Sequence, residues 1–97
     1  MTITASLVEC VAGITPRTIP ATAQAVARHC ILDWFGVTLA GSREPLSDIL
    51  VRELAPAGTG DATLVGRSER SGLLDAALIN GAMSHALDFD DTHTLMS

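Results

Sequence analysis

The fold class of this chain is decided by one long stretch, PATAQAVARHCILDWFGVTLA, which covers residues 20–40. Its apolar side chains recur at spacings of three and four residues, which is the period of one face of an α-helix. Pro20 suits the first turn of a helix, and Gly41 followed by Ser42 is typical of a helix end. The pattern predicts the main helix of the protein over 20–40.

The second half of this stretch predicts where the core lies. From Cys30 onward the residues are apolar on nearly all sides, apart from Asp33, which is typical of a buried helix. We therefore expect Trp34 and Phe35 to be core residues. A carboxylate within such a helix needs a partner, so we expect Asp33 to pair with an arginine elsewhere, including one across an interface.

Further outward, the chain contains three more helical patterns and one β-type segment. Apolar periodicity, with glycine and proline near the boundaries, predicts helices over about 4–13, 45–54 and 72–90 and a short strand over about 62–65. The predicted fold class is therefore mostly α. In the last helix, the expected inward face consists of Leu74, Ala77, Leu78, Gly81, Ala82, His85 and Phe89.

Length and composition bound the domain organisation. The 97 residues form one domain at most, and so short a chain buries only a modest fraction of its surface. Yet 47% of the residues are hydrophobic, and the mean hydropathy is +0.35. Either a partner covers this apolar surface, or the residues that would cover it are missing. We favour missing residues, so that 1–97 is a partial N-terminal helical domain.

Charge and local patterns argue against several classes of protein. The formal net charge is −5, and the six basic residues are all arginines that form no dense patch. Nucleic acid and anionic membrane surfaces are therefore not expected as partners. The longest apolar run, over 30–40, is too short to span a bilayer, and residues 1–6 lack the basic start of a secretory signal.

The two cysteines, Cys10 and Cys30, both lie in apolar helical contexts and form no CxxC motif. We expect them to be buried thiols rather than ligands of zinc or of an iron–sulfur cluster. This cysteine usage predicts a reducing, cytoplasmic compartment.

Chemically active side chains gather in INGAMSHALDFDDTH, residues 79–93. Three carboxylates and two imidazoles, with hydroxyl and amide groups, interrupt an otherwise apolar run. If the last helix continues to residue 90, Asn80, Ser84 and Asp88 lie on one line at a spacing of four, and Thr92 joins them if the helix persists. Such a line, flanked by apolar residues, predicts one wall of a polar cavity.

The same stretch offers groups for acid–base chemistry. Asp88, Asp90 and Asp91 crowd three carboxylates together, which favours a site that holds or takes a proton. His85 and His93 add imidazoles, the usual general acids and bases near neutral pH. Two alternatives stay open: a helix end followed by a solvated acidic turn, and a magnesium or manganese site with the histidine as a fourth ligand.

These residues resemble a known family. The pattern Asn80-Gly81-x-x-x-His85-x-Leu87-Asp88-Phe89-Asp90-Asp91-Thr92-His93 resembles the signature of the MmgE/PrpD family. Residues 33–42 resemble that family's first long helix and its Gly-Ser exit, and 62–66 followed by 75–81 resemble its strand-then-helix passage. The resemblance covers nearly the whole chain from about Ile19.

The resemblance implies an enzyme. The family contains 2-methylcitrate dehydratases, cis-aconitate decarboxylases and iminodisuccinate epimerases, which are several hundred residues long. Its members have a large helical domain and a smaller lid domain, and they are usually homodimers that need no iron–sulfur cluster. By this likeness the chain is part of a cytoplasmic, cofactor-free lyase or epimerase of propionate or related metabolism. Its substrate would be a small di- or tricarboxylate, and its chemistry proton transfer next to a carboxylate.

Positions that match the family's motif imply roles for individual residues. Asp88 would orient the substrate or transfer a proton, Thr92 would hydrogen-bond a substrate carboxylate, and His93 is the third catalytic candidate. Asp91, His85 and Asn80 are the substrate-binding candidates, the last two more as architecture around the site. The chain alone is expected to be inactive, because the family's further histidine and lysine residues are absent from it.

Two other classes of function compete with this interpretation. The first is a free-standing helical module that dimerises through the helix over 20–40, with Ile31, Trp34 and Phe35 as its contact surface. The second is a fragment of a metal-dependent hydrolase that uses the aspartate cluster.

Overall fold

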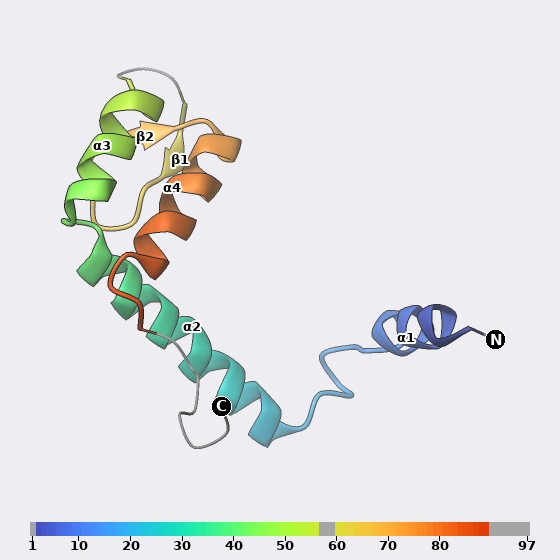
Figure 1. Ribbon diagram of the computed structural model, residues 1–97. Helices are drawn as coiled ribbons and strands as arrows, with labels where there is room; N and C mark the ends of the chain where they lie inside the picture. Colours follow the sequence, from blue (N-terminus) through green and yellow to red (C-terminus); the bar gives the residue numbers. More distant parts are fainter. Residues whose placement is uncertain (1, 57–59, 90–97) are drawn as a thin grey trace. The chain divides into compact units, whose positions relative to one another are not determined.

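The computed structural model describes residues 2–56 and 60–89. Within them lie helix α1 (Ile3–Ala12), helix α2 (Ala21–Gly41), helix α3 (Pro45–Leu54), strands β1 (Ala62–Thr63) and β2 (Arg70–Ser71), and helix α4 (Leu73–His85) (Figure 1). The mostly α fold class is confirmed. The predicted boundaries are correct for α3 and differ by one residue at each end for α1 and α2. The chain divides into two compact units, Met1–Ile31 and Leu32–Ser97.

The first unit has no core among its described residues. Helix α1 begins at Thr2, whose Oγ1 accepts a hydrogen bond from the Ala5 amide at 3.0 Å, and it ends at Gly13. None of residues 2–31 is buried. The predicted burial of the thiols is therefore wrong: Cys10 and Cys30 are both exposed, because no described part of the chain covers them.

The core lies in the second unit, where α3 packs against α4 and the small sheet lies against α4 (Figure 1). Among the residues that the structure describes, six hydrophobic ones are buried there: Val51, Ala55, Leu64, Ala76, Ile79 and Met83. Three of them come from α4 at spacings of three and four, so a single stripe of that helix faces the core.

The predicted inward face of α4 is wrong. Leu74, Ala77, Leu78, Gly81, His85 and Phe89 are exposed, and Ala82 is half-buried. The helix is apolar on nearly all sides, so its periodicity does not single out one face. The face that packs is the one that fits against α3, and it consists of the smaller set Ala76, Ile79 and Met83.

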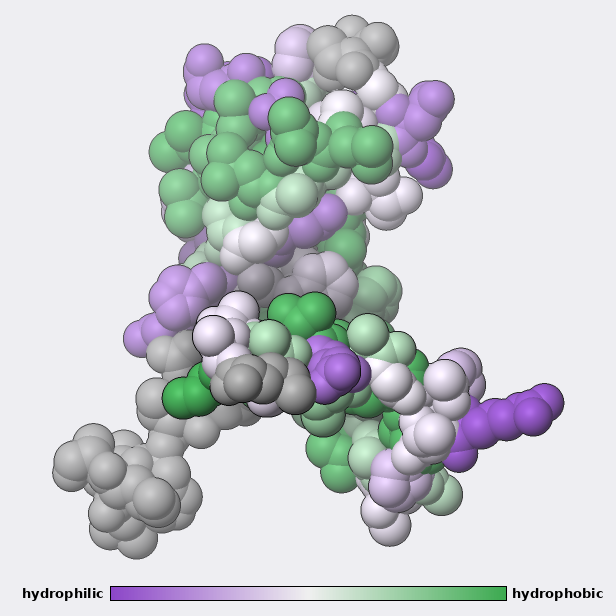
Figure 2. Space-filling model, turned by 90° about the vertical axis from the view of Figure 1, so that its right-hand side faces the viewer, coloured by the Kyte–Doolittle hydropathy of each residue, from purple (hydrophilic) through white to green (hydrophobic). Residues whose placement is uncertain are grey.

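Large apolar side chains also remain exposed on α2. Trp34 is 42% exposed and Phe35 is 46% exposed, so the prediction that they belong to the core is wrong for this chain. Figure 2 shows extended hydrophobic areas on the face turned toward the viewer. Large exposed patches of this kind are typical of surfaces that bind a protein, a membrane or a ligand. The expectation that apolar surface is left uncovered is thus met within the described residues.

The predicted strand over 62–65 is shorter than expected and has a partner that was not predicted. Ala62 pairs with Ser71 and Thr63 with Arg70 in an antiparallel ladder. Residue Gly66 follows with φ +75, a left-handed conformation that glycine adopts without strain. After this turn the chain returns, and Arg70 and Ser71 form the second strand, β2.

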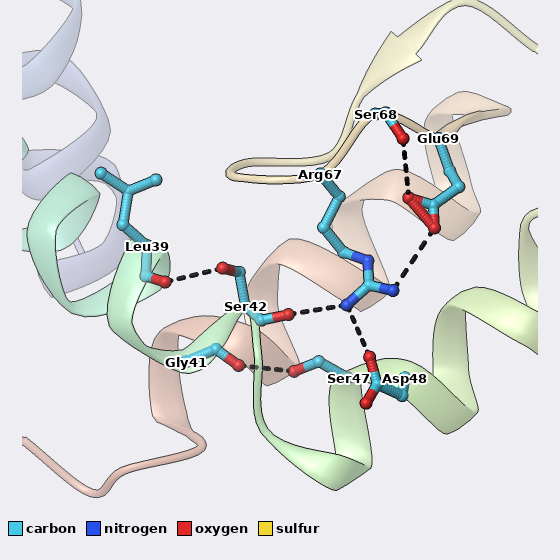
Figure 3. Close-up of polar contacts among 8 residues, drawn as sticks. All are labelled: Leu39, Gly41, Ser42, Ser47, Asp48, Arg67, Ser68 and Glu69. Carbon is cyan, nitrogen blue, oxygen red and sulfur yellow. Dashed lines mark hydrogen bonds and ion pairs between the residues drawn. The ribbon is translucent and has the colours of Figure 1, made fainter.

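The ends of α2 and α4 cross backbone to backbone. A Cβ atom at Gly41 would lie 2.0 Å from the carbonyl oxygen of Met83, so no larger residue fits without displacing one helix. The Ser47 hydroxyl donates to the Gly41 carbonyl at 2.7 Å and the Ser42 hydroxyl to the Leu39 carbonyl at 2.6 Å (Figure 3). These buried hydroxyls satisfy carbonyl groups at the helix end.

Arg67 ties this helix end to α3 and to the hairpin (Figure 3). One guanidinium nitrogen lies 2.8 Å from both the Ser42 carbonyl and Asp48 Oδ1, and the other lies 3.3 Å from Glu69 Oε2. The hydrogen bond to Asp48 raises the pKa of Arg67. The backbone amide of Glu69 lowers the pKa of its own carboxyl group, and Arg67 adds to this effect. Both groups are therefore charged at neutral pH.

We expect Arg67→Lys to lower the free energy of unfolding by about 1–2 kcal/mol, because an ammonium group cannot reach three oxygens in the directions of a guanidinium. The loss is modest because Asp48 is open to water, which screens the ion pair. Urea unfolding followed by circular dichroism measures it. Arg52→Lys is the control, since Arg52 is exposed and makes no ion pair within 2–56 and 60–89. Equal effects of the two variants would contradict the role of Arg67.

No helix among the described residues is long and apolar enough to cross a membrane.

Candidate active site

The candidate site begins where α4 ends, five residues earlier than predicted. The helix was expected to reach residue 90, but its last residue is His85. Asp88 has φ 57, in the left-handed region, and its amide donates to the His85 carbonyl at 2.9 Å. Aspartate is one of the few residues that visit this region. The chain therefore turns away from the helix axis at the carboxylate that the sequence singles out.

The turn brings two predicted site residues together. His85 Nε2 lies 3.7 Å from Asp88 Oδ1, and the side chains are 71% and 76% exposed. At this separation the two form an ion pair when the imidazole is protonated. Both groups are open on the surface of the second unit, so a ligand can reach them directly. An imidazole beside a carboxylate is an arrangement that can give and take protons.

Asn80, a predicted substrate-binding residue, holds the hairpin. Its Oδ1 accepts from the Val65 amide at 2.9 Å and its Nδ2 donates to the Thr63 carbonyl at 2.9 Å. The side-chain amide thus continues the β ladder where β1 stops. This places Asn80 in the architecture that fixes α4 against the hairpin, and a contact between Asn80 and substrate stays a prediction.

We expect Asn80→Ala to lower the free energy of unfolding by about 1–3 kcal/mol, because it leaves a backbone amide and a backbone carbonyl without partners. Thermal unfolding followed by circular dichroism gives the change. Ser84→Ala, one turn along α4, is the matched control, since within the described residues the Ser84 hydroxyl donates just to the Gly81 carbonyl of its own helix. A loss of stability in Ser84→Ala as large as that in Asn80→Ala would refute the role of Asn80 in holding the hairpin.

The predicted polar line along α4 is not formed. Asn80 points to the hairpin, Ser84 bonds its own helix, and Asp88 lies beyond the last helical residue. The spacing of four fails because it requires a helix that continues past His85. The polar wall is thus replaced by a short turn that presents His85 and Asp88.

Four further residues of the predicted site, Asp90, Asp91, Thr92 and His93, lie outside the described residues. Their predicted roles stay predictions. Among the residues that the structure does describe, no group of three or more histidine, cysteine, aspartate or glutamate side chains is placed to hold a metal ion.

The sequence interpretation missed one residue that shapes the region. No local pattern singled out Arg67, yet it joins the end of α2, α3 and the hairpin. Its partners Asp48 and Ser42 lie 19 and 25 residues away in the chain, so no local pattern could identify them. The nearest signal was an arginine directly after Gly66, at a turn between acidic residues.

The comparisons with known proteins agree with the resemblance. Residues 5–96 match the family model described as the MmgE/PrpD N-terminal domain. The cis-aconitate decarboxylase-like protein oryM of Aspergillus oryzae is 31% identical over 93 residues, which are 95% of this chain and 19% of that protein. The chain therefore spans about a fifth of the length of this curated relative. No solved structure matches the chain at a significant level. Because the family model covers nearly the whole sequence, this chain belongs to the MmgE/PrpD family.

Proposed function

We propose that this chain is the N-terminal helical domain of a lyase or epimerase that acts on a small di- or tricarboxylate, similar to 2-methylcitrate dehydratase. The reaction is proton transfer at a carbon next to a carboxylate. The observation that carries the proposal is the His85–Asp88 pair, presented by a left-handed turn at the end of α4. Family membership and a relative named as cis-aconitate decarboxylase-like support the substrate class.

In this proposal Asp88 moves the proton. A carboxylate accepts a proton from the carbon beside a substrate carboxylate, and a neighbouring imidazole receives or returns it. His85, at 3.7 Å from Asp88, is placed for that second role. Thr92 and His93, four and five residues beyond Asp88, are proposed to bind a substrate carboxylate and to act as a further acid or base. Asp91 and Asn80 complete the surroundings of the substrate.

We also propose that residues 1–97 do not turn over substrate by themselves. A tricarboxylate carries several negative charges, whereas this chain has a formal net charge of −5. Arg67, the least exposed of the arginines, is held by Asp48 and Glu69 and is not available to a ligand. Groups that bind substrate carboxylates therefore come from the remainder of the enzyme, which is proposed to be a cytoplasmic homodimer without a cofactor.

The test begins with the product of the native gene, tagged at its locus and purified, with its intact mass measured. We expect a polypeptide several times longer than 97 residues, as in the relative. This polypeptide is then assayed with 2-methylcitrate, cis-aconitate and iminodisuccinate, and each reaction is followed by the compound that it forms. Turnover of one of them supports the proposal and identifies the reaction. A long product that turns over none of these three, or measurable turnover by residues 1–97 alone, contradicts it.

A second candidate is favoured by the exposure of Trp34 and Phe35 on α2, which suits a free-standing helical dimerisation module. The intact mass of the native gene product distinguishes this module from the proposed enzyme. A native product of 97 residues that is a monodisperse dimer in sedimentation would support the module and exclude the enzyme.

A further inference from the structure

A hollow of about 390 Å³ lies in the second unit, and neither His85 nor Asp88 is among its described lining residues. Its lining consists of Asp33, Gly36, Val37 and Ala40 of α2, together with Phe89. Four of these five residues are apolar. Among the described residues of this lining, a single carboxylate therefore stands in an apolar wall, which is unusual for a surface that only meets water.

Asp33 has no partner within the described residues. It makes no hydrogen bond and no ion pair within 2–56 and 60–89, although an arginine partner was expected from the sequence. The ion pairs of the described arginines go to Asp48 and Glu69, both taken by Arg67. No group in the described part of the chain therefore compensates the charge that this carboxylate brings to the hollow.

The glycine at position 36 is not explained by crowding within the described residues. A Cβ atom at this position would meet nothing within 4 Å, so no described part of the chain requires glycine here. Glycine in a helix interior is unfavourable relative to alanine. With Ala40 one turn further on, it leaves a shallow strip of α2 that another backbone can approach closely.

We propose that this hollow is the docking surface for an arginine-bearing segment of the same polypeptide that lies outside residues 1–97. An apolar segment seated on Gly36, Val37 and Phe89 would exclude water from Asp33, and a carboxylate shielded from water requires a cationic partner. A guanidinium group suits this position because it pairs with both carboxylate oxygens and is more weakly hydrated than an ammonium group.

The charge of the hollow also decides against substrate as its occupant. Unlike Asp88, Asp33 has no imidazole beside it among the described residues, so it would only repel a di- or tricarboxylate, and we do not assign the hollow to the proposed substrate. The placement of the occupant in the same polypeptide rests on the proposed function, in which this chain is one domain of a longer enzyme. It agrees with the curated relative, of which this chain matches 19%.

The first experiment captures the occupant in the native product, tagged at its locus. An aliphatic diazirine amino acid replaces Val37, and after irradiation the cross-linked peptides are identified by mass spectrometry. The same amino acid at Arg52, exposed on α3, is the control. We expect Val37 to capture one peptide from outside residues 1–97 that contains an arginine, and the control not to capture it. No cross-link, a peptide without arginine, or a peptide from residues 1–97 of either copy would overturn the proposal.

The second experiment tests the charge and the close approach. We expect Asp33→Asn to lower the Tm of the native product by roughly 5 °C and Asp33→Arg to lower it by more. Replacing the captured arginine with aspartate in the Asp33→Arg variant should restore the Tm, because the two charges are then exchanged. Gly36→Ala is expected to lower Tm as well, whereas on an uncovered helix alanine would raise it. A raised Tm for Gly36→Ala would overturn the proposal. Enzyme activity is not a readout, so a failed turnover assay and a failed docking test remain distinguishable.

Discussion

Replacing Asp88 with asparagine is expected to lower kcat of the full enzyme by roughly 10²- to 10⁴-fold, the usual contribution of a general acid or base. Asparagine has nearly the same shape and also tolerates the left-handed region, so the turn after α4 should persist. What is lost is the ability to accept a proton. The measurement is steady-state turnover of the carboxylate that the native product uses.

Asp75→Asn is the matched control for this variant. Asp75 lies in the first turn of the same helix, and the substitution is chemically identical. It should change kcat by less than about threefold, since its only expected effect is a weaker interaction with the helix dipole. Full activity of Asp88→Asn would remove Asp88 from the chemistry and leave the turn as a purely structural feature.

A second substitution at the same position separates strain from chemistry. Asp88→Gly should also abolish turnover, but it should raise the free energy of unfolding by about 1 kcal/mol, because glycine adopts φ 57 without steric cost. An inactive protein that is more stable than its parent would show that the turn is kept strained for the sake of the carboxylate. Reduced stability would mean that the Asp88 side chain is needed for folding.

Replacing Ile79 with alanine is expected to destabilise residues 1–97 by about 2–5 kcal/mol. Ile79 is fully buried, and it contributes one of the larger side chains to a core of six hydrophobic residues. A small domain has only about 5–15 kcal/mol of stability in total, so this variant should lose a large share of it and unfold at a clearly lower urea concentration. Urea unfolding followed by circular dichroism measures the change.

The neighbouring Leu78→Ala is the control, and it compares the structure directly with the sequence-based prediction. Leu78 is 55% exposed, so its truncation in residues 1–97 should change stability by less than about 0.5 kcal/mol. The sequence pattern had placed Leu78 inward and omitted Ile79. If Leu78→Ala proves the more damaging change, the face of α4 assigned by the structure is wrong.

The contrast between these neighbours explains how far the sequence could predict the fold. The helices α1, α2 and α3 begin and end beside proline, glycine or a capping hydroxyl, which are local signals, and their predicted bounds are within one residue. The face of α4 is not a local property. Its apolar residues surround the helix, so only the shape of α3 and the hairpin decides which of them is buried.

The candidate site divides in the same way. The motif identified Asp88 and His85 because their residue types are rare together in an apolar run, and the structure places them 3.7 Å apart. The helix end between them was not predicted, since no glycine or proline follows His85 and a left-handed aspartate leaves no sequence signal of its own. Asn80 was predicted beside the substrate because a side-chain amide can bond either a ligand or the protein backbone. In the structure it bonds the backbone of the hairpin.

The division of the chain at Ile31 and Leu32 falls inside α2, and it has a consequence for hydrogen exchange. Residues 2–31 have no buried member, so amides in the first half of this helix are protected only by their own helical bonds. The second half ends at buried Thr38 and Gly41, where α4 crosses it. One continuous helix should therefore exchange with two rates: within seconds to minutes near Ala25, and only on opening of the core near Leu39.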